Sequence, residues 1–167
     1  GQFFARAALN LWSDVMGVTF TEVTTGGNIT FDDTQEGAFA SSTRSGNTII
    51  SSEVNVDTAW IAADGTNLNS YSFQTYIHEI GHALGLGHAG NYNGNADYAV
   101  DAHYLNDSWA TTVMSYFSQT ENTYFAGLGF NQAYITSPMV ADMIAMTEMY
   151  GTATTTRTGN TTYGNGN

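Results

Sequence analysis

Three of the four histidines in the chain, His78, His82 and His88, fall within one short segment. His78 and His82 are four residues apart, so on a helix their imidazoles lie on one face and can share a metal ion. Gly85 permits the positive φ of a sharp turn, which would bring His88 back to the other two. Three neutral imidazole nitrogens bind Zn²⁺ and leave its fourth position open for water. The spacing therefore predicts a zinc site that is open on one side.

Glu79 adds an acid–base group to this predicted site. It lies one residue round the helix from His78, which places its carboxylate beside the metal rather than on it. Zinc lowers the pKa of bound water to about 7, and Glu79 can accept the proton as the water attacks a carbonyl. Histidines that merely packed on a buried helix would need neither Gly85 nor His88. These residues favour a hydrolytic zinc centre.

Helices that would position the site follow from the spacing of apolar residues. This spacing predicts helices over residues 3–17, 73–85 and 139–150. Ser72 is expected to cap the second helix, and Ser137, followed by Pro138, the third. Gly151 is expected to end the last helix.

Strands are predicted mainly in the first third of the chain. Alternating or β-branched residues predict them over 18–23, 28–31, 38–40 and 47–51. Residues 53–70 are expected to be largely irregular, and residues 89–112 to form a long loop. Strands early and helices late indicate the α+β class.

Composition narrows the classes of function. The 167 residues include 3 basic and 15 acidic side chains, a net charge of −12. This excludes nucleic acid and anionic lipid as partners, because both require clustered Lys or Arg. A hydrophobic share of 42% excludes a disordered chain, and no apolar run approaches the ~20 residues of a membrane span. Without cysteine, disulfides and thiolate zinc sites are excluded too.

The segment from Thr75 to Gly94, together with Met114-Ser115-Tyr116, resembles the serralysin family of secreted bacterial zinc endopeptidases. Within it, His78 to His88 matches the metzincin pattern H-E-x-x-H-x-x-G-x-x-H, which is accompanied by a Met-turn. The resemblance implies a metzincin-like zincin. Such a fold has a twisted N-terminal mixed sheet, an active-site helix with HExxH, and a C-terminal helix after the Met-turn.

The resemblance also implies a role for individual residues. It implies that one catalytic Zn²⁺ is bound by His78, His82 and His88, with Glu79 as the general base. Tyr116 is implied as a resting-state ligand that later donates a hydrogen bond to the oxyanion, and Met114 as the apolar floor in the Met-turn. The edge strand that pairs with substrate is implied to comprise Ala38, Phe39 and Ala40. Spacing alone favours a core tyrosine at position 116, and the functional role comes from the resemblance.

The same resemblance divides the chain into residues 1–151, a catalytic domain, and residues 152–167, a linker toward a calcium-binding repeat domain. Residues 156–163 are similar to the entry of that domain, for which the family implies Ca²⁺. The chain is therefore expected to be a piece of a longer protease rather than a natural minimal form. Residues 2–11 carry no signal-peptide pattern, so secretion by one-step export is what the family implies.

The expected activity is hydrolysis of internal peptide bonds in extended or unfolded proteins, with a proteinaceous inhibitor as a further partner. One alternative is a zinc-binding but catalytically silent fragment that binds a peptide or an inhibitor. Another is a metal-stabilised structural domain. Glu79 argues against this last alternative, because a structural zinc site has no use for an adjacent base.

Five other polar residues allow two interpretations each. His103 is expected to be a solvated loop histidine rather than a second metal ligand. Asp97, Asp101 and Asp107 could hold Ca²⁺, although their spacing is not that of an EF-hand. Asp142 could anchor a neighbouring backbone group or lie exposed on the last helix.

Overall fold

The computed structural model describes residues 1–156 and 158–160. Its elements, in chain order, are α1 (Gln2–Val15), β1 (Ile29–Asp32), β2 (Ala38–Ser45), β3 (Thr48–Val56), α2 (Thr58–Asp64), α3 (Tyr71–Ala83), α4 (Tyr98–Asp101), α5 (Thr123–Gly127) and α6 (Val140–Tyr150). Helices and a mixed sheet confirm the α+β class. No helix in this described part is long and apolar enough to cross a membrane.

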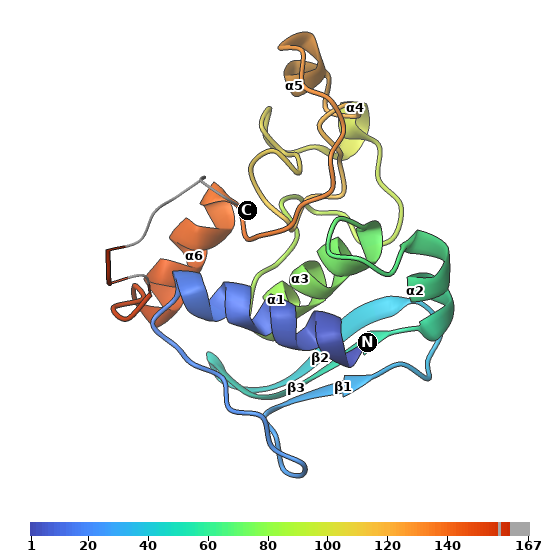
Figure 1. Cartoon of the computed structure of the whole chain (residues 1–167). Helices are drawn as coiled ribbons and strands as arrows, with labels where there is room; N and C mark the ends of the chain where they lie inside the picture. The colour runs from blue at the N-terminus through green and yellow to red at the C-terminus, as the bar shows by residue number, and fades with distance from the viewer. Residues whose placement is uncertain (157, 161–167) are drawn as a thin grey trace.

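The sheet has the order β1-β3-β2. β1 pairs with β3 in parallel, and β2 pairs with β3 antiparallel, from Ala38 opposite Val56 to Ser45 opposite Thr48. β2 is therefore an edge strand of this sheet, and one of its sides remains available for backbone pairing. Figure 1 shows α1 and α3 crossing one face of the sheet.

Helix α3 passes through the centre of the molecule. Phe73, Ile77 and Ile80 are buried on it. The indole of Trp12 on α1 donates a hydrogen bond to the carbonyl of Ile77 over 3.1 Å, so α1 is tied to α3 in the core. Ser70, not Ser72, caps this helix and accepts a hydrogen bond from the N–H of Phe73. The prediction of Ser72 was wrong because Ser72 is itself buried within the first turn.

Residues 18–23 do not form the predicted strand. They are irregular, and Val23 is 55% exposed. Alternation stabilises a strand only where a neighbour pairs with it, and in the described residues the nearby bridge joins Met16 to Thr152 instead. The other three predicted strands are confirmed. β2 and β3 are longer than expected because their Ser-rich ends pair with each other.

Three short helices were not predicted: α2 lies within the segment expected to be irregular, α4 within the long loop, and α5 beyond it. The last helix begins later than predicted. Its N-cap is Met139 rather than Ser137, and the Asp142 carboxylate accepts the Met139 N–H over 2.8 Å. Gly151 ends the helix with φ of 78°, as predicted.

Candidate metal centre

The three histidines of the motif converge on one point. Their ring nitrogens lie within 4.8 Å of one another, and among the described residues this is the one group of three or more potential ligands that could hold a metal ion. His78 and His82 come from α3, and His88 comes from the turn that follows it. The structure thus brings together the three residues that the spacing predicted.

Backbone carbonyls hold the outer nitrogen of each ring. Nδ1 of His78 lies 2.8 Å from the carbonyl oxygen of Val113. Nδ1 of His82 and of His88 lie 2.8 Å from the carbonyls of Leu86 and Tyr92 respectively. Because a carbonyl only accepts, each Nδ1 carries the proton and donates it. All three Nε2 atoms therefore carry lone pairs, as metal ligands must.

The Nε2 atoms of His82 and His88 are 3.0 Å apart. Two lone pairs facing at this distance repel unless a cation lies between them. Tetrahedral zinc with Zn–N bonds of about 2.0–2.1 Å would hold such nitrogens about 3.3 Å apart. The donor set and its spacing therefore fit Zn²⁺.

Burial keeps the three imidazoles neutral. Burial, with a smaller contribution from the neighbouring His82, lowers the pKa of His78 to about 3. Burial likewise lowers the pKa of His82 and of His88. At neutral pH no proton competes for these ligand nitrogens.

Two glycines make this convergence possible. Gly85 has φ of +111°, which lets the chain turn at the end of α3 toward His88. Gly81 faces Met114, and a Cβ added there would come within 2.7 Å of the Met114 sulfur. Met114 therefore packs directly against the backbone of the helix that bears His78 and His82. That it belongs to a Met-turn stays a prediction.

Glu79 is the acidic group beside the histidines. It is only 7% exposed, and burial raises its pKa to about 7. A carboxylate with this pKa can both accept and return a proton near neutral pH.

Tyr116 lies against the same cluster. Its ring centroid is 4.5 Å from that of His88, in an edge-on arrangement. Its hydroxyl accepts a hydrogen bond from the N–H of Gly94 over 3.4 Å. The phenol is therefore close to the metal ligands without being buried in the core.

An open cleft of about 400 Å³ joins these groups to the sheet edge. Its lining comprises Ala38, Phe39, Ala40, Ser42, Arg44, His78, Glu79, His82, Leu86, His88, Asn93 and Tyr116. The predicted edge-strand residues of β2 thus share one cleft with the histidines, Glu79 and Tyr116.

Sequence reasoning missed the residues that support the cluster from behind. Tyr92 supplies the carbonyl for His88, and its hydroxyl accepts a 3.4 Å hydrogen bond from the N–H of Tyr116. That hydroxyl donates to the buried carboxylate of Asp107. No sequence pattern joins Tyr92 to Asp107, because both lie in a loop without periodicity.

Asp142 proves to be an anchor rather than a surface residue. Only 2% exposed, it accepts hydrogen bonds from the Thr112 hydroxyl and the Val113 N–H as well as from Met139. It therefore fixes the segment whose carbonyl orients His78. Burial raises the pKa of Asp142, while these three donors oppose the shift.

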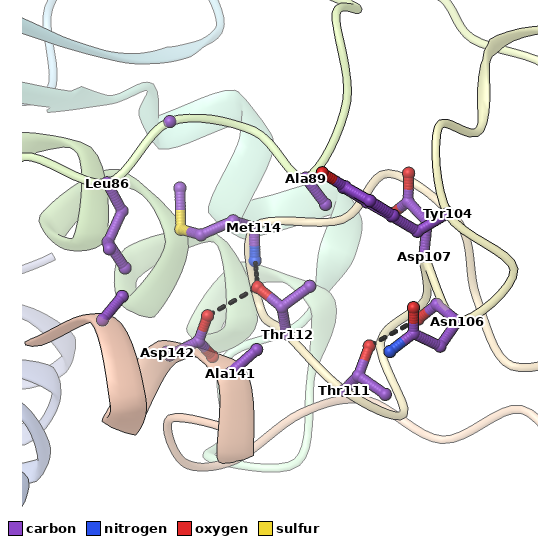
Figure 2. Close-up of a pocket in the computed structure, with 12 residues that line it drawn as sticks. Leu86, Ala89, Tyr104, Asn106, Asp107, Thr111, Thr112, Met114, Ala141 and Asp142 are labelled. Carbon is purple, nitrogen blue, oxygen red and sulfur yellow. Dashed lines mark hydrogen bonds between the residues drawn. The ribbon is translucent and has the colours of Figure 1, made fainter.

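A second cavity of about 250 Å³ has Met114 in its lining. Figure 2 shows the Thr112 hydroxyl between the Met114 N–H, from which it accepts a hydrogen bond, and the Asp142 carboxylate, to which it donates one. The cavity contains none of the three histidines and so is separate from the metal centre.

The remaining polar residues do not add a metal site. His103 is exposed and packs edge-on against Tyr104. Asp97 caps α4, the Asp101 side chain accepts the N–H of Asp97, and Asp107 is bound to Tyr92. In the described part of the chain these three carboxylates do not gather into a cation-binding group.

Comparison with known proteins agrees with this geometry. The matrixin family model (M10) matches residues 2–94, and the peptidase M66 model matches residues 61–129. The chain therefore belongs to the matrixin family, and the expected serralysin-type metzincin catalytic domain is confirmed.

Curated relatives cover almost the whole chain. Metallopeptidase AprA of Pseudomonas marginalis is 37% identical over 175 residues, which cover 96% of this chain and 36% of the relative. Serralysin of Proteus mirabilis is 36% identical over 181 residues, with the same coverage. A serralysin C of Dickeya chrysanthemi is 39% identical over 175 residues, or 35% of its length. The chain thus spans little more than a third of these relatives.

Proposed function

We propose that the chain is the catalytic part of a secreted zinc endopeptidase that cleaves internal bonds of extended or unfolded proteins. The observation that carries this proposal is the orientation of the three imidazoles. All three donate Nδ1–H to backbone carbonyls, so their Nε2 atoms are directed to one point beside Glu79. His78, His82 and His88 would hold the ion there.

Zn²⁺ bound at this point would acidify a water molecule and polarise the scissile carbonyl. Glu79 accepts the proton of the attacking water and then delivers it to the leaving amine. Its pKa of about 7 suits both transfers. The Tyr116 ring packs edge-on against His88 in the same cleft, which supports its proposed roles as a ligand of the ion at rest and as a hydrogen-bond donor to the oxyanion afterwards.

Substrate would lie along β2. Ala38, Phe39 and Ala40 begin an edge strand that lines the cleft, so an extended peptide can add to the sheet through its main chain. Main-chain pairing requires an unfolded segment but little sequence preference. This supports cleavage within extended chains rather than at termini.

We also propose, from the relatives, the domain organisation, the export route and the control of the protease. Residues 1–151 would form the catalytic domain, and residues 152–167 would lead toward a calcium-binding repeat domain. Residues 157 and 161–167 of that segment lie outside the described residues. Secretion by one-step export and control by a proteinaceous inhibitor complete the proposal.

The test is Glu79→Gln. We expect this variant to retain about one zinc per chain by elemental analysis and to lose casein cleavage by about a thousandfold or more, since Glu79 is the one carboxylate among the described residues that line the cleft. Glu148→Gln, an exposed change of the same type on α6, is the matched control. Casein cleavage by Glu79→Gln at the wild-type rate would refute the mechanism. Zinc binding without cleavage by the wild type would instead identify a silent peptide-binding module.

A further inference from the structure

Among the described residues that line the cleft, one has a basic side chain, Arg44. Of the basic side chains in the described residues, Arg6 forms an ion pair with Glu22 over 2.7 Å and does not line the cleft. Arg44 lines the same cleft as Glu79 and the three histidines, and it is exposed. Within the described part of the chain, no carboxylate lies within ion-pair distance of it. Its charge acts on the nearby Tyr150 phenol, where it opposes the effect of burial on the pKa. In a chain of net charge −12, an exposed arginine that pairs with no described carboxylate is an unusual placement.

The Arg44 side chain lies at the far end of the β2 wall of the cleft. Ala38, Ala40 and Ser42 share one face of the strand, and Arg44 lines the same cleft just after the pairing register with β3 shifts between Thr43 and Arg44. Ser42 lies beside Ser52, whose hydroxyl donates to the carbonyl of Ala83 at the end of α3. Arg44 therefore emerges just beyond the C-terminus of that helix.

A purely structural role would be to neutralise the carbonyls that end α3. Those carbonyls already have donors. Ala83 accepts from Ser52, and Leu84 accepts the hydroxyl of Tyr150 over 2.6 Å. The carbonyls of Ile80, Gly81 and His82 accept backbone N–H groups of the following turn. The helix end therefore leaves no carbonyl that requires Arg44.

We propose that Arg44 is a subsite for an acidic side chain of the substrate, on the N-terminal side of the scissile bond. The inference rests on the proposed endopeptidase function. A peptide that adds antiparallel to β2 runs from the Arg44 end toward Ala38, so its N-terminal part meets Arg44. A guanidinium there pairs with Glu or Asp, which the acidic remainder of the protein would otherwise repel.

The distance along the strand sets the position of the acidic residue. In this proposal the cleaved bond lies opposite Ala40, the last of the predicted edge-strand residues, and Arg44 is four residues beyond it, or about 13 Å at 3.3 Å per residue. We therefore expect the acidic residue to lie three to five positions before the cleaved bond. Because the pair is exposed to solvent, the preference should be about two- to fivefold and should decline as salt is added.

The experiment uses matched fluorogenic peptides with one cleavage site. In the first set, Glu or Gln occupies the third, fourth or fifth position before the cleavage site. In the second set, Glu or Gln occupies the third, fourth or fifth position after the site. The zinc-loaded protein should cleave the Glu peptide of the first set with a two- to fivefold higher kcat/KM than the Gln peptide. In the second set the ratio should be about one.

Arg44→Gln should bring the first ratio to about one, and Arg44→Glu should invert it in favour of a Lys peptide. Arg6→Gln, which removes an equal charge far from the cleft, should leave the ratio unchanged. A wild-type ratio of one at low salt, a preference confined to the second set, or an unchanged ratio in Arg44→Gln would overturn the proposal. The wild-type ratio alone decides the matter if an Arg44 variant fails to fold.

Peptide-binding measurements test the Arg44 subsite independently of the proposed endopeptidase activity. The same peptides, labelled and titrated by fluorescence anisotropy into Glu79→Gln, report the subsite without cleavage. If the wild type cleaves neither peptide, the proposed function fails, yet tighter binding of the Glu peptide still supports the subsite. Equal affinities for the Glu and Gln peptides would refute it.

Discussion

The hydroxyl of Tyr92 lies 3.0 and 3.1 Å from the two carboxylate oxygens of Asp107. The pair is buried behind the third histidine, and Asp107 is only 2% exposed. Tyr92 contributes its carbonyl to His88 and accepts a hydrogen bond from the N–H of Tyr116. One tyrosine thus supports both a candidate ligand and the candidate oxyanion donor.

Replacing Tyr92 by Phe should therefore destabilise the protein. It would leave the buried Asp107 carboxylate without its hydroxyl donor, which costs about 1–3 kcal/mol. Zinc affinity should decline with it, because the carbonyl that orients His88 becomes less fixed. Urea unfolding and zinc competition titration measure both effects. Tyr98→Phe, which removes an exposed hydroxyl that donates to Leu105, is the control, and equal losses in the two variants would contradict this prediction.

Asp142→Asn should weaken the support of His78. The carboxylate accepts three hydrogen bonds, whereas an amide offers only one oxygen, so at least one buried donor loses its partner. We expect a loss of about 2–3 kcal/mol in the free energy of unfolding, since hydrogen bonds to charged groups are the strong ones. Glu148→Gln on the same helix should change it little. Stability equal to that of the wild type would show that the anchor is dispensable.

Acid should destabilise the zinc-free protein. The folded-state pKa of His78 is about 3, below its ordinary value of 6.5, and those of His82 and His88 are lowered too. As the pH falls below about 6.5, the unfolded chain therefore binds more protons than the folded one, and stability declines. Urea unfolding between pH 7.5 and 5 measures this slope.

Glu79 opposes that trend. Its raised pKa of about 7 means that between pH 7 and 4.5 the folded state binds more protons at this site than the unfolded chain does, so stability here is lost as pH rises. Glu79→Gln should therefore show a steeper loss of stability on acidification than the wild type. A shallower loss would contradict the assigned burial of Glu79.

Gly81→Ala should strain the contact between α3 and Met114. The new Cβ would meet the Met114 sulfur at 2.7 Å, and overpacking of this kind costs about 1–3 kcal/mol. Met114→Ala in the same chain should recover part of that cost, a non-additivity that a double-mutant cycle by urea unfolding detects. Gly87→Ala, where a Cβ meets nothing within 4 Å, is the control. Simple additivity of Gly81→Ala and Met114→Ala would refute the contact.

The histidine cluster could be predicted because its determinants are local. Residues four apart on a helix share a face whatever surrounds them, and Gly85 marks the turn within the same eleven residues. The α+β class followed from equally local patterns. By contrast, the predicted strand over 18–23 failed because a strand depends on a partner that local alternation does not reveal.

The supporting contacts could not be predicted for a similar reason. Tyr92 and Asp107 meet across an irregular loop, and Asp142 reaches Val113 from 29 positions away. Arg44 reads in the sequence as an ordinary polar residue of a hairpin. Only the register of β2 on β3 and the end of α3 place it in the cleft.

The three carbonyls that hold the imidazoles belong to Leu86, Tyr92 and Val113, all downstream of α3. An ion bound by the three imidazoles would therefore connect the stretch between positions 86 and 113 to α3 through these three hydrogen bonds. Closing such a stretch costs chain entropy, and binding of the ion would supply the compensation. Occupancy of the site and ordering of that stretch would then be one equilibrium, so each would stabilise the other.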